Sequence, residues 1–180
     1  MGPISSMLAR GLSDENPEMK QKCASFAASL CREHPEKVGS YMKNVTDAMV
    51  VNLDHQHKNV RKQTLLSLKD VLVARNAELY LQDCIKQLRF IMNDRSADVR
   101  RTFYEVVEHW LINMDLNAIK VFEGEFVLCL LNGVADEQEE IGNLAKRLLD
   151  DHGKRMKDAL TQLGELEPEK NKNTDSDMID

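Results

Sequence analysis

A nine-residue motif recurs four times along the chain, and this repetition restricts the possible folds more than any other feature. The four windows align without gaps, and each has an apolar residue at its first and eighth positions. The eighth positions, Met19, Val60, Val99 and Ile141, are 41, 39 and 42 residues apart. Such a period indicates similar units that bury their apolar faces against one another. The windows cover residues 12–20, 53–61, 92–100 and 134–142.

Each window is expected to be a turn between two helices. Asn16 followed by Pro17 predicts a helix start, with an N-cap and proline at the first helical position. Ser96 is expected to cap the third repeat in the same way, with Asp98 near the positive end of the helix. After each window, apolar residues recur at offsets four, seven, eight and eleven from the eighth position, which fall on one helix face.

The period and the helical spacing predict an all-α fold. A repeat of about 40–47 residues belongs to HEAT and armadillo units, so we expect a right-handed α-α superhelix of about four helix pairs. Residues 1–163 form this HEAT-repeat solenoid, and residues 164–180, which carry −4 of the net charge of −6, are expected to be a disordered acidic tail. The expected helices lie near 4–12, 17–33, 38–53, 58–75, 78–92, 97–113, 120–134 and 139–161.

The first expected helix is short and carries Ile4, Met7, Leu8 and Leu12. A terminal repeat normally has a polar outer face. The apolar residues therefore indicate either that the array continues or that this end docks on another surface.

Several functional classes are disfavoured by composition. With the acidic tail set aside, the remaining charge is close to zero, which gives no field to attract nucleic acid or anionic lipid. The longest apolar run, residues 126–131, is too short to span a membrane. No secretory signal is recognisable, so we expect a cytoplasmic protein. No catalytic motif occurs, and we expect neither enzymatic activity nor a cofactor.

The cysteines, Cys23, Cys31, Cys84 and Cys129, form no C-x-x-C pair. Without a secretory signal they are expected to be reduced thiols that pack as small apolar residues.

Three sequence strings resemble one family more closely than a generic repeat would. They are the run from Leu12 to Cys23, the string His-Gln-His-Lys-Asn-Val-Arg at residues 55–61, and Val99-Arg-Arg101 with Trp110-Leu111. In this order and spacing they resemble the HEAT-repeat axonemal dynein assembly factor, over about residues 8–163. The resemblance implies a cytoplasmic role in dynein-arm pre-assembly for ciliary motility, with dynein chains, chaperones and other assembly factors as partners.

Charged residues at fixed positions of the windows have two interpretations. The acids could accept cations of a partner and the bases could hold acidic peptides, or the two sets could bond to each other between neighbouring turns. We favour the structural interpretation, because repeat-locked positions serve the stack first. This turn ladder consists of Asp14, Lys20, Arg61, Asp94, Arg100 and Asp136.

Two histidines invite a metal interpretation. His55 and His57 could share one ion, but a zinc site needs three or four ligands and sequence offers no third one nearby. We therefore expect no metal site, and expect that one imidazole caps the helix that begins near Lys58. His109, on one helix with Glu105 and Glu108, is expected to make ordinary surface charge pairs.

The candidate binding surface is the exposed stripe of the second helices, at offsets two, six, nine and thirteen. In solenoids of this kind the second helices line the concave side, where extended ligands bind. In the first repeat the stripe includes Ala28. In the two central repeats it consists of Lys62, Leu66, Lys69, Val73, Arg101, Glu105, Glu108 and Ile112.

The favoured function is a protein-binding scaffold that resembles a dynein-arm assembly factor. The main alternative is a generic HEAT-repeat scaffold or adaptor of the phosphatase-scaffold or nuclear-transport type. A nucleic-acid-binding array would need a basic inner stripe, and here Lys62, Lys69 and Arg101 are offset by acids.

Overall fold

The computed structural model describes residues 2–75 and 78–162, and these residues contain helices and turns but no strand. The acidic tail of residues 164–180 lies outside the described residues. The chain divides into two compact units, Met1–Leu149 and Asp150–Asp180. No helix among the described residues is long and apolar enough to cross a membrane. The helices are α1 (Gly2–Leu12), α2 (Pro17–Glu33), α3 (Pro35–Val38), the 3-10 helix η1 (Gly39–Tyr41), α4 (Lys43–Asn52), α5 (Lys58–Val71), α6 (Glu78–Ile91), α7 (Ala97–Asn113), α8 (Leu116–Val134) and α9 (Glu139–Gln162).

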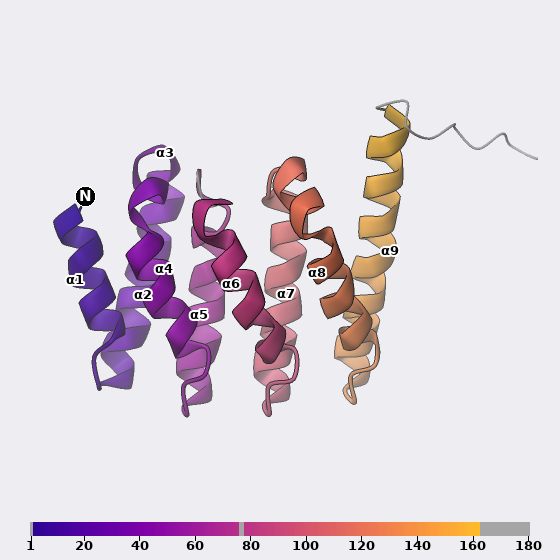
Figure 1. Ribbon diagram of the computed structural model, residues 1–180. Coiled ribbons are helices and arrows are strands. Elements are labelled where there is room, and N and C mark those ends of the chain that lie inside the picture. Colours follow the sequence, from indigo (N-terminus) through magenta and orange to yellow (C-terminus); the bar gives the residue numbers. More distant parts are fainter. Residues whose placement is uncertain (1, 76–77, 163–180) are drawn as a thin grey trace, which may run out of the picture. The chain divides into compact units, whose positions relative to one another are not determined.

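The first unit is a solenoid of helix pairs, which confirms the predicted fold class. The first helices of the pairs, α1, α4, α6 and α8, form one row, and the second helices, α2, α5 and α7, form the row behind it (Figure 1). The beginning of α9, up to Leu149, is the fourth second helix. Within each row a helix contacts its counterpart in the next repeat, so every repeat covers the apolar stripe of its neighbour.

Helix boundaries follow the predictions most closely where a turn window begins the helix. The side chain of Asn16 accepts a hydrogen bond from the Glu18 amide, so α2 starts at Pro17 as predicted. Ser96 precedes α7 but makes no side-chain capping bond, so its predicted capping role is wrong. The expected helix at 38–53 is divided into α3, η1 and α4.

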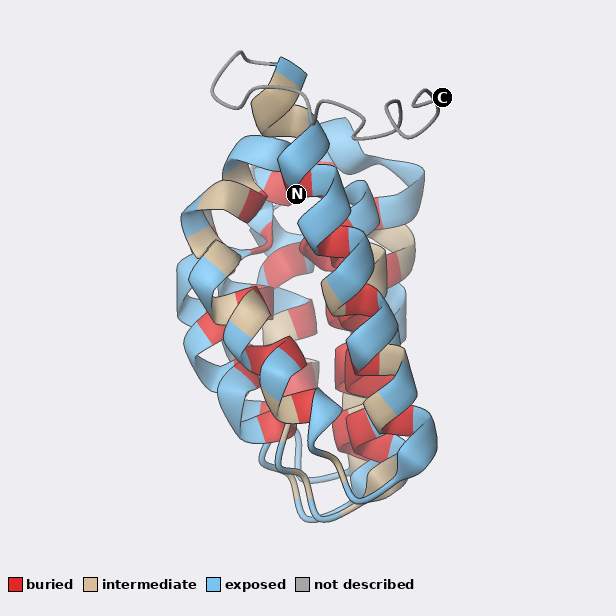
Figure 2. Ribbon diagram, turned by 90° about the vertical axis from the view of Figure 1, so that its right-hand side faces the viewer, coloured by how far each residue is buried: buried red, intermediate tan, exposed pale blue. Residues whose placement is uncertain are grey.

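The core lies between the two rows, where the buried residues of the helices face one another (Figure 2). Val60 and Val99, which occupy the same repeat position, are both buried, as the repeat alignment predicts. Trp110 is buried as well, and its indole N–H donates to the Lys69 carbonyl 3.2 Å away. The first repeat departs from the pattern, because Met19 and Phe26 occupy apolar offsets that are buried in the other repeats and are exposed here.

Candidate protein-binding surface

The turns of adjacent repeats are joined by buried ion pairs. Arg61 donates to both carboxylate oxygens of Asp94 at 2.6 and 2.8 Å. Arg100 donates to both oxygens of Asp136 at 2.7 and 3.0 Å. All four side chains are almost fully buried, so each guanidinium compensates a carboxylate that water does not reach. The base of one repeat thus binds the acid of the next.

Each acid also closes its own turn. Asp94 Oδ1 accepts a hydrogen bond from the Ser96 amide at 2.8 Å, and Asp136 Oδ1 accepts one from the Gln138 amide at 2.9 Å. Asp14 makes the equivalent bond with the Asn16 amide. The cations bind backbone as well, since Arg100 donates to the Asp94 carbonyl at 2.8 Å. The side chains of Arg61, Asp94, Arg100 and Asp136 are therefore all engaged in bonds within the solenoid.

The first rung of the ladder has a different chemistry. The second window has His55 where the others have Asp, so Lys20 finds no carboxylate there. Lys20 Nζ donates instead to Asn52 Oδ1 at 3.0 Å and to the Leu12 carbonyl at 2.9 Å. The Asn52 amide donates to the same Leu12 carbonyl. An amide thus replaces the carboxylate between the first two repeats.

The histidine pair belongs to this turn. His55 Nδ1 accepts a hydrogen bond from the His57 amide at 3.1 Å, which imitates the aspartate turns of the other windows. The His57 side chain makes no capping bond to α5, so the predicted imidazole cap is wrong. Burial, followed by the charge of Lys20, lowers the pKa of His55. No cluster of three or more potential metal ligands occurs among the described residues.

The charged residues of the predicted stripe are mostly paired across repeats. Lys62 Nζ lies 2.7 Å from Asp98, and the hydrogen bond from Lys62 lowers the pKa of that carboxyl. Arg101 lies 3.2 Å from Glu105 and 3.1 Å from Glu140. Because each of these exposed charges lies beside an opposite charge, the stripe presents little net charge to a partner.

Glu108 completes this network, because Arg147 of the fourth repeat donates to it at 2.8 Å. The predicted charge pairs of His109 with Glu105 and Glu108 do not form. His109 instead interacts with Asn113, one turn further along its own helix. Burial and then the charge of Lys69 lower the pKa of His109.

A shallow groove of about 320 Å³ runs between α5 and α7. It contains five of the eight predicted residues, and the side chain of Ile112 is 60% exposed at its edge. Leu66 is half-buried in the same groove. Lys69 also lies there, and no described residue forms an ion pair with it. The groove is lined by Leu66, Lys69, Glu105, Val106, Glu108, His109, Ile112 and Asn113.

The model of the family described as dynein axonemal assembly factor 5-like, TPR repeats, matches residues 1–159. The chain belongs to this dynein axonemal assembly factor 5-like family. The family description names TPR repeats and not the HEAT repeats that we expected, although the period of this chain is longer than the 34 residues of a TPR unit. No curated protein matches the chain.

A solved structure supports the fold of this family member. The crystal structure of an engineered protein from the Northeast Structural Genomics Consortium is similar with a TM-score of 0.64 and 17% sequence identity. The match covers 88% of this chain and 68% of the engineered protein. At this identity the similarity concerns the fold alone.

Two predicted stripe positions do not face solvent as expected. Val73 is half-buried against the core, and Ala28 of the first repeat is buried. Ala28 lies on α2, whereas Val73 follows the end of α5 at Val71, so the helix that we expected to reach residue 75 ends before it. Conversely, the groove includes Val106, His109 and Asn113, which the sequence pattern did not assign to the surface. The last two lie one position beyond the predicted offsets nine and thirteen, so a wider stripe would have included them.

Proposed function

We propose that this chain is a protein-binding scaffold for the cytoplasmic pre-assembly of axonemal dynein arms. Membership of the dynein axonemal assembly factor 5-like family supports a role in this assembly process. The repeat architecture supports the mode of action, because stacked helix pairs offer an extended surface and the described residues form a groove on it. We propose that the chain acts by binding and not by catalysis.

The observation that carries this proposal is the groove between α5 and α7. Its apolar residues Leu66 and Ile112 stand among charges that are already paired within the stack, such as Glu108 with Arg147. A partner that covers the groove therefore gains apolar contact without having to strip solvent from many unpaired charges. Lys69 remains available for one acidic group of the partner.

The binding experiment is affinity capture from ciliating cells, followed by mass spectrometry. The wild-type chain should enrich dynein chains, chaperones or other assembly factors. Ile112→Asp should reduce that enrichment about tenfold or more, because it places a charge at the edge of the apolar contact. Ile112 is mostly exposed, so the variant should fold normally, which circular dichroism checks.

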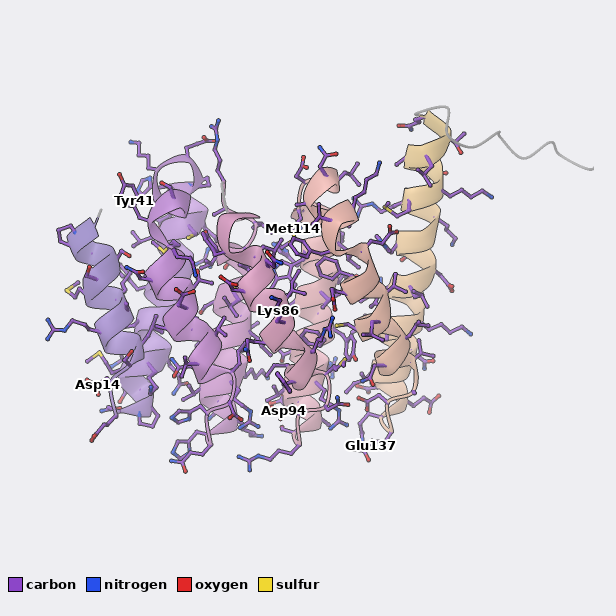
Figure 3. The ribbon with its side chains drawn as sticks, viewed as in Figure 1. Asp14, Tyr41, Lys86, Asp94, Met114 and Glu137 are labelled. Atoms are coloured by element: carbon purple, nitrogen blue, oxygen red, sulfur yellow. The ribbon has the colours of Figure 1, made fainter. Side chains whose placement is uncertain are left out.

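The control is Lys86→Ala. Lys86 lies on α6, in the row of first helices that faces the viewer in Figure 3, away from the groove between α5 and α7. This variant should capture the same partners as the wild type. Equal capture by Ile112→Asp and wild type would show that partners bind elsewhere on the chain.

A further inference from the structure

The helix α8 exposes an apolar stripe on the outer side of its row. Val121 is 75% exposed, Leu131 53% and Leu128 47%, and Gly124 is exposed between them. These four residues are three, four and three positions apart, which is the spacing of the seam along which two helices pack in a coiled coil. We call them the α8 seam. Only three of the 19 residues of α8 are charged, and none of the three lies in the seam: Lys120, Glu123 and Glu125.

The same positions of the two preceding first helices carry mostly polar residues. The counterparts of Gly124 and Leu128 on α4 and α6 are exposed, although another repeat packs beside each of these helices. Exposure is therefore a property of these positions, and a following repeat would not cover the α8 seam. The polar counterparts are Lys43 and Asp47 on α4, and Gln82, Lys86 and Arg89 on α6.

Gly124 is not required by the packing of the solenoid. A Cβ atom on Gly133, on the same helix, would lie 2.5 Å from the ring of Tyr104, so the core needs a glycine there. A Cβ atom on Gly124 would meet nothing within 4 Å. Glycine destabilises a helix interior relative to alanine, and no packing among the described residues compensates for it at position 124. The glycine leaves a notch beside Leu128, which a large side chain of another helix can fill.

We propose that the α8 seam binds the α8 seam of a second copy of this chain, with the two helices antiparallel. Residues at equal distances on either side of the two-fold axis face each other in such a pair. With the axis at the level of residue 126, Leu128 of each copy fills the notch at Gly124 of the other. The same axis places Val121 opposite Leu131, because residue 126 is the midpoint of both pairs.

The charges beside the seam are complementary in this arrangement. Arg89 of α6 donates to both carboxylate oxygens of Glu125, the residue next to Gly124. The two-fold axis brings this neutral pair opposite the same pair of the second copy, so each guanidinium comes near a carboxylate of the other copy. A membrane surface is a poorer match, since anionic lipid attracts bases and Lys120 is the only base on α8. A helix of another protein could cover the stripe, but a notch and a leucine that one axis relates favour a second copy.

The size of the seam predicts a weak dimer. From Val121 to Leu131 it extends over about 15 Å and is one helix wide, which is below the roughly 1,200 Å² that stable complexes bury. We therefore expect a dissociation constant of about 10–500 μM.

The dimer would leave both binding grooves open. α8 belongs to the row of first helices, whereas α5 and α7 lie in the row behind it (Figure 1). A dimer would therefore offer two grooves to a partner with two binding segments, which raises the overall affinity. This consequence rests on the proposed function, whereas the contact between the two seams does not depend on it.

The first test is sedimentation equilibrium of the chain from about 5 to about 1,000 μM, a range that brackets the expected dissociation constant. The wild type should change from monomer to dimer, and Leu128→Asp should raise the dissociation constant about tenfold or more. The matched control is Phe26→Asp on α2, in the other row, where the side chain is 50% exposed. This variant should dimerise like the wild type. A wild type that stays monomeric, or association that Phe26→Asp abolishes and Leu128→Asp does not, would overturn the proposal.

The second test exchanges the notch and the leucine. Gly124→Leu alone should weaken association about tenfold or more, because two leucines then meet, and Leu128→Gly alone should weaken it because two glycines meet. A mixture of the two single variants should associate within about threefold of the wild type, since every leucine again faces a glycine. Circular dichroism checks that each variant is folded. A mixture that associates no better than either variant alone would overturn the antiparallel contact between positions 124 and 128.

Discussion

Arg61 and Asp94, 33 positions apart in sequence, form a bidentate ion pair whose side chains are only 5% and 6% exposed. The pair joins the turn of the second repeat to that of the third. Lys62, the next residue, forms a pair of the same charge type with Asp98, but both of its members are far more exposed. The two pairs thus provide a matched comparison of burial on one helix.

Arg61→Met should destabilise the protein by about 3–5 kcal/mol, because it leaves the Asp94 carboxylate buried without a cation. Lys62→Met should cost less than about 1 kcal/mol, since its ion pair is screened by water. Urea denaturation followed by circular dichroism measures both free energies of unfolding. Similar decreases in the free energy of unfolding of the two variants would show that burial does not determine how much each ion pair stabilises the protein.

Acid should weaken the ladder at Asp136. The hydrogen bonds from Arg100 hold the pKa of this carboxyl below its ordinary value of 3.8. As the pH falls, the unfolded state binds the proton first, so the contribution of the pair is complete above the unfolded value and is lost as the pH falls through the folded value. The stability difference between wild type and Asp136→Asn should be constant above about pH 5 and should shrink below about pH 4. A difference that persists unchanged to the lowest pH that can be measured would contradict this.

The helix starts could be predicted because their signals are local. Asn16 and Pro17 act within one turn, and α2 begins where they predict. The interruption before α4 brings Gly39 against a distant segment. A Cβ atom on Gly39 would lie 1.8 Å from the carbonyl oxygen of Arg75, so the backbones approach too closely there for another residue. That contact joins residues 36 positions apart, and periodicity carries no information about it.

The same limit applies to the candidate surface. A helical period gives the direction of Leu66 and Ile112, and both lie in the groove. It does not show that α5 ends at Val71, so that Val73 follows the helix and packs on the core. Nor does it show that Glu108 is neutralised by Arg147 from the next repeat.

The repeat alignment predicts a large penalty at Val99. Val99→Asp would bury a charge without a partner and should cost about 3–5 kcal/mol. Val121→Asp makes the same chemical change on α8, where the side chain is 75% exposed, and should stay within about 0.5 kcal/mol. Thermal and urea denaturation of the two variants test this, and a tolerated Val99→Asp would refute the alignment.

The thiols should fall into two classes. Burial raises the pKa of Cys31 and Cys129 to about 11 and that of Cys84 to about 12. Cys23 is less buried, although burial and the charge of Asp14 raise its pKa as well. At about pH 8 a thiol reagent should modify Cys23 first, and the other three only after unfolding. Cys23→Ser should remove the fast phase, and a fast phase that remains would place the accessible thiol elsewhere.

The most direct measurement of the proposed function is photo-crosslinking from the groove in ciliating cells. A photoreactive phenylalanine analogue replaces Ile112 in one variant and Lys86 in the other, and mass spectrometry identifies the crosslinked proteins. We expect position 112 to crosslink to a dynein chain, a chaperone or another assembly factor, and position 86 to give no such product. Crosslinks to these proteins from position 86 alone, or from neither position, would contradict a binding role for the groove between α5 and α7.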